Sequence, residues 1–97
     1  MSNVHFVDTS VLVELLNVPN MNERHAQAEE EYNDLAARGD VFVLPVAVLV
    51  ETGNHIAHIS NGTMRRQIAK RFSALIQQAM KSEGNWNTVP NIPMDTL

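Results

Sequence analysis

The segment 3–16, NVHFVDTSVLVELL, constrains the fold of this chain most. Its apolar run over 4–7 is rich in β-forming residues and predicts a short buried strand. Asp8 ends that run, and Thr9 and Ser10 can each cap a helix, which the following aliphatic residues continue at helical spacing. We therefore expect an acid at the carboxyl end of a buried strand, where ligands bind in open α/β sheets.

The rest of the chain alternates helices and strands in the same way. After the first helix we expect a helix from Asn22 to about Arg38, a strand over 41–44, helices over 46–57 and 63–82, and a short strand from Trp86 to Val89. Buried strands that alternate with helices predict an α/β fold with a short parallel sheet flanked by helices.

The two later helices each carry an apolar stripe that predicts a buried face. In the first of them Gly53 interrupts the helix at a cost of about 1 kcal/mol, which we expect close packing against a neighbour to offset. The predicted buried positions are Val46, Leu49, Val50, Gly53, Ile56 and Ala57, followed by Met64, Ile68, Phe72, Leu75, Ile76 and Ala79.

Length and composition limit the classes of protein to consider. The 97 residues make one domain or part of one, and 44% apolar residues support a small core. The absence of cysteine excludes disulfides and thiolate metal sites. A reducing cytoplasm is therefore the simplest setting. No apolar run can span a bilayer, and no signal peptide is apparent.

Charge is distributed unevenly along the chain. Residues 1–51 hold nine acids and two bases, whereas residues 52–97 hold two acids and five bases. All five late bases lie between Thr63 and Ser82, with no acid among them. This pattern indicates an acidic half followed by a basic helix, which can present a local phosphate-binding face or simply a solvated one. The candidate RNA-binding residues are Arg65, Arg66, Lys70 and Arg71.

Asp8 and Glu51 are the main candidate site. Glu51 follows the second strand, in the helix over 46–57, and adjacent parallel strands joined by right-handed crossovers would direct both carboxylates to one place. Two carboxylates and water commonly hold Mg²⁺ or Mn²⁺, which can activate water for phosphodiester hydrolysis. The alternative is that Asp8 only caps a helix and that Glu51 is a surface acid.

Two stretches resemble the start of a PIN domain, in particular the VapC-like toxin ribonucleases. They are VHFVDTSVLVELL and LPVAVLVETGNHIAH, and the order of elements is similar from Asn3 to about Met80. The resemblance implies a three-layer α/β/α fold and a ribonuclease of the toxin-antitoxin type that uses Mg²⁺ or Mn²⁺. It also implies RNA as substrate and a cognate antitoxin as partner. We expect a homo-oligomer for a different reason: at most three strands leave an exposed sheet edge, and the two apolar helix stripes present more surface than so short a sheet can cover. No membrane partner is expected, because no apolar run is long enough to span a bilayer.

By this resemblance, Asp8 and Glu51 correspond to the first two acids of the metal site, and Thr9 and Ser10 to the small polar residues that support it. The later acids of the family have no counterpart, because Asp95 lies in a proline-flanked tail. We therefore expect a single PIN-like domain over 1–97 that lacks the C-terminal part, with weakly bound or absent metal and little nuclease activity alone.

The histidines have simpler explanations. His55 and His58 share a helix face with Glu51, so a carboxylate–His–His metal cluster is conceivable, although two solvent-facing histidines are more common. We expect His5 to be a hydrogen-bonded sheet residue and His25 to be on the surface. The competing functions are thus a metal-dependent endoribonuclease and a non-catalytic PIN-like module that binds a partner or itself.

Overall fold

The computed structural model describes residues 2–88, which form one parallel sheet and one layer of helices. The strands are β1 (Val4–Phe6), β2 (Val41–Leu44) and β3 (Trp86–Thr88), and the helices are α1 (Thr9–Leu15), α2 (His25–Ala37), α3 (Val46–Ala57) and α4 (Gly62–Met80). Val89, the predicted end of the last strand, and Asp95 lie outside the described residues.

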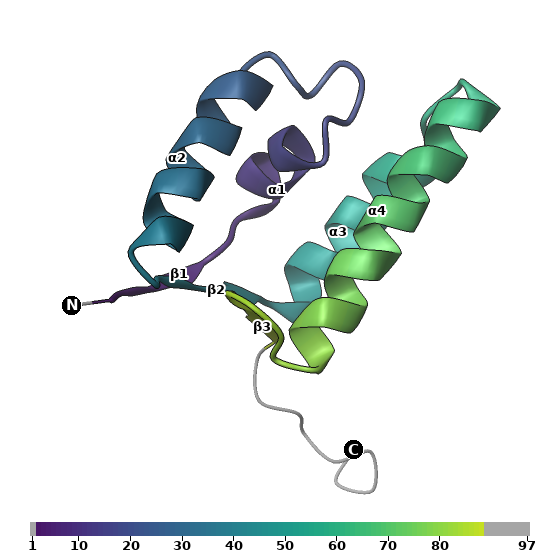
Figure 1. The fold of residues 1–97 in the computed structure, drawn as a ribbon. Coiled ribbons are helices and arrows are strands. Elements are labelled where there is room, and N and C mark those ends of the chain that lie inside the picture. Colours follow the sequence, from purple (N-terminus) through teal and green to yellow (C-terminus); the bar gives the residue numbers. More distant parts are fainter. Residues whose placement is uncertain (1, 89–97) are drawn as a thin grey trace, which may run out of the picture.

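The sheet has the order β1-β2-β3, and both strand pairs are parallel. The predicted α/β fold, with a short parallel sheet flanked by helices, is therefore confirmed. The connection from β1 to β2 and the connection from β2 to β3 both move across the sheet in the same direction. Right-handed connections that do so place their helices on the same face of the sheet. Figure 1 shows α1 to α4 on one side of the strands. Residues 2–88 thus form two of the three expected layers.

An aromatic cluster fills the space between the sheet and α2. Phe42 and Trp86 are register partners on β2 and β3, and Tyr32 of α2 lies over both, with ring centroids 4.9 Å and 5.4 Å away. The Trp86 indole Nε1 donates a hydrogen bond of 2.9 Å to Tyr32 Oη. The cluster therefore anchors α2, which has no fully buried residue, to β2 and β3.

The opposite face of the sheet carries exposed apolar side chains. Val4 and Phe6 are 61% and 69% exposed, whereas His5 between them faces the helices and stacks on Phe42. The expectation that the first strand buries its apolar residues is wrong for these two. The reason is that β1 is an edge strand and that no described helix covers this face.

The buried arc of α3 also differs from the expected stripe. Val48, Thr52 and Ile56 are buried, whereas Val46 and Val50 are 68% and 58% exposed. Helix α3 contacts both α1 and α4. The side of α3 that faces these two helices carries Val48, Thr52 and Ile56, and Val46 and Val50 lie outside it. A Cβ atom on Gly53 would lie 3.8 Å from Phe72 Cε2, which is ordinary contact, so the predicted close packing does not require glycine there.

Asparagine side chains lie before α2 and α4, and only one of them caps its helix. Asn61 caps α4, because its Oδ1 accepts a 3.0 Å hydrogen bond from the Met64 amide. Asn22 does not cap α2, which begins at His25; instead Asn22 Nδ2 donates to Asn17 Oδ1 at 2.8 Å. Even the longest described helix, α4, lacks the apolar character that a membrane crossing requires, and the other three are too short.

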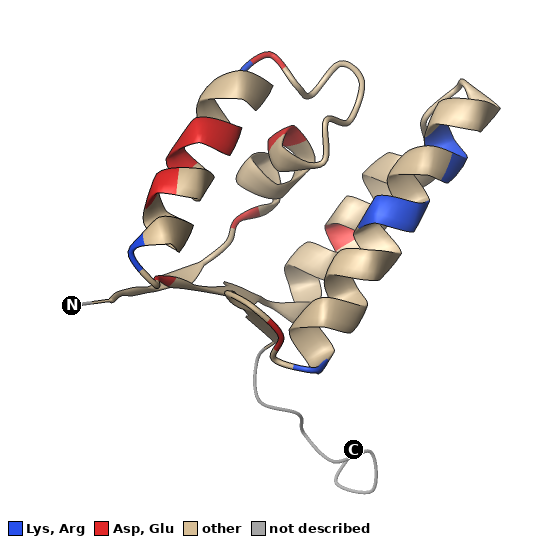
Figure 2. Ribbon diagram, in the orientation of Figure 1, with Lys and Arg blue, Asp and Glu red and all other residues tan. Residues whose placement is uncertain are grey.

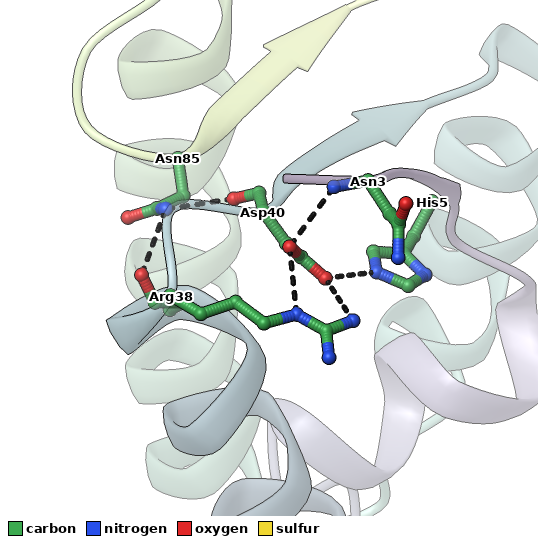
Figure 3. Close-up of polar contacts among 6 residues, drawn as sticks. Asn3, His5, Arg38, Asp40 and Asn85 are labelled. Atoms are coloured by element: carbon green, nitrogen blue, oxygen red, sulfur yellow. Dashed lines mark hydrogen bonds and ion pairs between the residues drawn. The ribbon is translucent and has the colours of Figure 1, made fainter. Parts of the chain in front are cut away.

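A buried carboxylate joins the segments at the amino ends of the strands (Figure 3). Asp40 is fully buried and accepts hydrogen bonds from Arg38 Nε at 3.0 Å and Nη2 at 2.8 Å, and from the Asn3 amide at 3.0 Å. His5 Nε2 lies 2.7 Å from Asp40 Oδ2, which confirms that His5 is a hydrogen-bonded sheet residue. Asn85 Nδ2 donates to the Asp40 carbonyl at 2.7 Å, so all three strands meet here.

These contacts decide the charge state of Asp40. The hydrogen bonds from Arg38 hold the pKa of the Asp40 carboxyl well below its usual range, and the bonds from His5 and Asn3 act in the same direction. Burial of the carboxyl raises its pKa, but by less than the hydrogen bonds lower it. Because the pKa is lower in the folded state than in the unfolded state, ionised Asp40 stabilises the fold above about pH 4, and this contribution declines as the pH falls further.

We predict that Asp40→Asn lowers the melting temperature at pH 7 and that its deficit relative to the parent chain shrinks below about pH 4. The reason is that protonation removes from the parent the same charge that the substitution removes. Thermal unfolding followed by circular dichroism between pH 2.5 and pH 7 measures this. Asp34→Asn on the exposed face of α2 is the matched control, with little effect at either pH. A deficit for Asp40→Asn that does not change with pH would contradict this explanation.

Candidate functional site

Asp8 lies at the carboxyl end of β1 and is itself the N-cap of α1. Its Oδ1 accepts a 2.9 Å hydrogen bond from the Thr9 amide, and its Oδ2 accepts one of 3.1 Å from Ser10 Oγ. The expectation that Thr9 or Ser10 caps this helix is therefore wrong, because the extended backbone of Asp8 places its own carboxylate over the first turn. Asp8 is exposed, so its remaining lone pairs face solvent.

Thr9 links Asp8 to Glu51. Thr9 is 8% exposed, and its Oγ1 donates a 2.9 Å hydrogen bond to Glu51 Oε2 on α3. Helices α1 and α3 are in contact, which follows from the position of each helix directly after neighbouring parallel strands. The structure thus brings together Asp8, Thr9 and Glu51, three of the residues that the sequence singled out, at the carboxyl edge of the sheet.

The donor set suits a hard cation that keeps much of its water. Asp8 and Glu51 are both exposed, and each carboxylate retains acceptor capacity beyond its bonds to Thr9 and Ser10. Oxygen ligands of this kind are typical for Mg²⁺ and Mn²⁺. Within residues 2–88 no cluster of three or more Asp, Glu or His side chains is placed to hold a metal, so water would complete most of the shell.

The histidines of α3 do not join this site. His58 Nδ1 donates to the Asn54 carbonyl at 2.7 Å, and His58 terminates the helix. Together with His55 it lines a separate cavity of about 220 Å³ at the far end of α3. The residues that the structure describes therefore do not form a Glu51–His55–His58 metal cluster.

His25 has a structural position that the sequence reasoning missed. Its Nδ1 lies 2.7 Å from the Glu14 carbonyl oxygen, and its Nε2 lies 3.0 Å from Glu29 Oε2. We expected His25 on the surface, and it is instead half-buried and connects the start of α2 to the end of α1. Its position after a turn gave no signal of these partners in the sequence.

Figure 2 shows bases along α4 and acids along α2, and Arg71 of α4 lines a hollow between the two helices together with Glu29 of α2. Arg66, Lys70 and Arg71 are exposed, whereas Arg65 is half-buried and its Nη1 donates a 2.8 Å hydrogen bond to the Ile59 carbonyl. Arg65 thus supports the turn before α4. The three exposed bases are the ones available for a phosphate backbone.

A groove beside β1 is the feature that sequence reasoning missed most completely. It has a volume of about 240 Å³ and lies between β1, α1 and α2, with Asp8 and Glu31 among its lining residues. The only signal in the sequence was the alternation of His5 between two apolar residues, which placed its side chain on the helix face of the sheet.

Comparisons of the chain with protein-family models, with curated proteins and with solved structures found no match. The resemblance to PIN domains therefore depends on the two sequence motifs around Asp8 and Glu51 and on the order of elements between them.

Proposed function

We propose that this chain is a metal-dependent endoribonuclease of the toxin-antitoxin type, with Asp8 and Glu51 as its metal ligands. The observation that carries the proposal is the Asp8–Thr9–Glu51 contact, in which one buried threonine bonds to both acids through its amide and its hydroxyl. A pair of exposed carboxylates fixed in this way at the carboxyl ends of parallel strands is suited to ligand binding rather than to stability alone.

The residues of this chain would have distinct roles in that reaction. Asp8 and Glu51 would hold Mg²⁺ or Mn²⁺, which when bound activates water and stabilises charge on the phosphodiester. Thr9 and Ser10 donate hydrogen bonds to these carboxylates, which restricts their rotamers and leaves their outer lone pairs toward solvent. Arg66, Lys70 and Arg71 would attract the RNA backbone.

A specific observation also favours the second candidate, a non-catalytic PIN-like module that binds a cognate antitoxin or another partner. Residues 2–88 offer only two carboxylates at the proposed metal site, and two carboxylates hold Mg²⁺ weakly when water must supply the rest of its shell. The exposed Val4 and Phe6 provide an apolar surface for a partner. An activity measurement separates the two candidates.

We predict slow cleavage of a labelled RNA pool in Mg²⁺ or Mn²⁺ that is abolished by chelation and reduced at least about 100-fold by Asp8→Asn or Glu51→Gln. Asparagine caps helices as well as aspartate does, so Asp8→Asn removes the charge and retains the cap. Gel electrophoresis of the products measures the rate, and Glu23→Gln at an exposed acid is the control with unchanged cleavage.

The other outcomes of this assay are equally informative. Cleavage that survives Asp8→Asn and Glu51→Gln would place the active site elsewhere. No cleavage in either metal, by a chain that is folded by circular dichroism, would favour the non-catalytic module.

We predict that RNA binding uses the exposed bases of α4. The double variant Arg66→Gln/Lys70→Gln should reduce the slope of log affinity against log salt by about 1.4, because two phosphate contacts on a single strand each release counterions. Fluorescence anisotropy between 50 and 300 mM salt measures this slope, and Arg24→Gln at the start of α2 is the control. An unchanged slope in the double variant would place the RNA on another surface.

A further inference from the structure

Strand β1 pairs with β2 on one side, and on its other edge no described residue forms backbone hydrogen bonds with it. Its inner groups bond to β2: the Asn3 carbonyl accepts from the Val41 amide at 2.9 Å, and the Val7 amide donates to the Val43 carbonyl at 3.0 Å. In a parallel ladder, alternate residues of a strand direct both their backbone N–H and their C=O toward the neighbouring strand, and the residues between them direct both groups away from it. The amides and carbonyls of Val4 and Phe6 therefore point away from β2, along the open edge of the sheet.

The groove beside β1 runs along this edge, between the strand and α2. Tyr32 and Leu35 of α2 provide an apolar wall, and His5 lies on the strand side. Asp8 and Glu31 contribute carboxylates, and both are exposed. A groove with an apolar wall and an acidic rim is complementary to a long side chain with an aliphatic stem and a cationic head.

Charge argues against a second copy of this chain at the edge. An antiparallel pairing of β1 with its own copy, about a twofold axis at His5, would place the two α2 helices next to each other on the same face of the joined sheet. Glu31, the acid of α2 that lines the groove beside β1, would then lie on the side that faces its own copy. Repulsion between these like charges disfavours that arrangement, whereas a basic partner would gain from the same carboxylate.

We propose that the open edge of β1 and the adjacent groove bind an extended, basic segment of a partner polypeptide. The segment would add a fourth strand to the sheet, with its backbone paired to Val4 and Phe6. Its central arginine or lysine would lie in the groove with the cationic head at Glu31. The flanking residues of the segment would point to the opposite face, beside the exposed Val4 and Phe6 side chains, so they should be apolar.

This site shares Asp8 with the proposed metal site, but the proposal does not depend on the nuclease activity. Its evidence is the unpaired backbone of β1, the groove and the charge of α2, none of which requires a metal at Asp8 and Glu51. A binding measurement without metal or RNA therefore tests it separately.

The probe is the peptide acetyl-Thr-Val-Arg-Val-Thr-amide, titrated into the full isotope-labelled chain and followed by amide NMR shifts. We expect saturable shifts at Val4, Phe6 and the groove side of α2. The same peptide with Glu in place of Arg should bind at least about tenfold more weakly, because it meets like charges. An Arg peptide with both valines N-methylated should also bind at least about tenfold more weakly, because its valine amides cannot donate hydrogen bonds to the backbone of β1.

Protein variants locate the charged head of the peptide. Glu31→Gln should weaken binding of the Arg peptide about threefold and reduce its salt dependence, as expected for one exposed ion pair. Glu30→Gln is the matched control, since Glu30 is adjacent in sequence but lines a different hollow on the outer side of α2, and it should change affinity little.

Three results would overturn the proposal. The first is equal binding of the Arg and Glu peptides or no saturable binding at millimolar peptide. The second is a set of shifts that avoids β1. The third is sedimentation evidence that the chain dimerises and that the Arg peptide acts only by competing with the dimer, which would make a second copy the occupant of the edge.

Discussion

The buried carboxylate of Asp40 is the interaction that holds the strands of this small sheet in place. A buried charge is costly unless it is paired and hydrogen-bonded, and Asp40 meets both conditions through Arg38, the Asn3 amide and His5. Its own carbonyl accepts from Asn85, which precedes β3. Because β1 is an edge strand of only three residues, these contacts at its amino end help to hold it on β2 and so position Asp8 at its carboxyl end.

The direction of the crossovers explains how one face of the molecule differs from the other. Both connections step from β1 toward β3, so the helices gather on one face and form the core there. The other face and the outer edge of β1 remain uncovered by residues 2–88, with Val4 and Phe6 exposed. The same arrangement therefore places the Asp8–Thr9–Glu51 contact at the carboxyl edge of the sheet and the proposed partner site along β1.

Sequence reasoning predicted the parts of the structure that follow from strand order. The proximity of Asp8 and Glu51 follows from two parallel strands that each lead into a helix, and this needed no knowledge of packing. Hydropathy could not show which side of a strand or helix a neighbour covers, so Val4, Phe6, Val46 and Val50 were expected to be buried and are exposed. The Asp40 cluster was missed because Asn3, His5 and Asn85 come from segments that only the fold brings to Asp40.

The central claim is that Asp8 and Glu51 share one divalent cation. Paramagnetic broadening of amide NMR signals by substoichiometric Mn²⁺ tests it most directly, because the broadening falls steeply with distance from the ion. We expect broadening centred on Thr9, Ser10 and the first turns of α3, and its loss in Asp8→Asn. Broadening centred on the acids of α2 instead, or unchanged in Asp8→Asn, would contradict the claim.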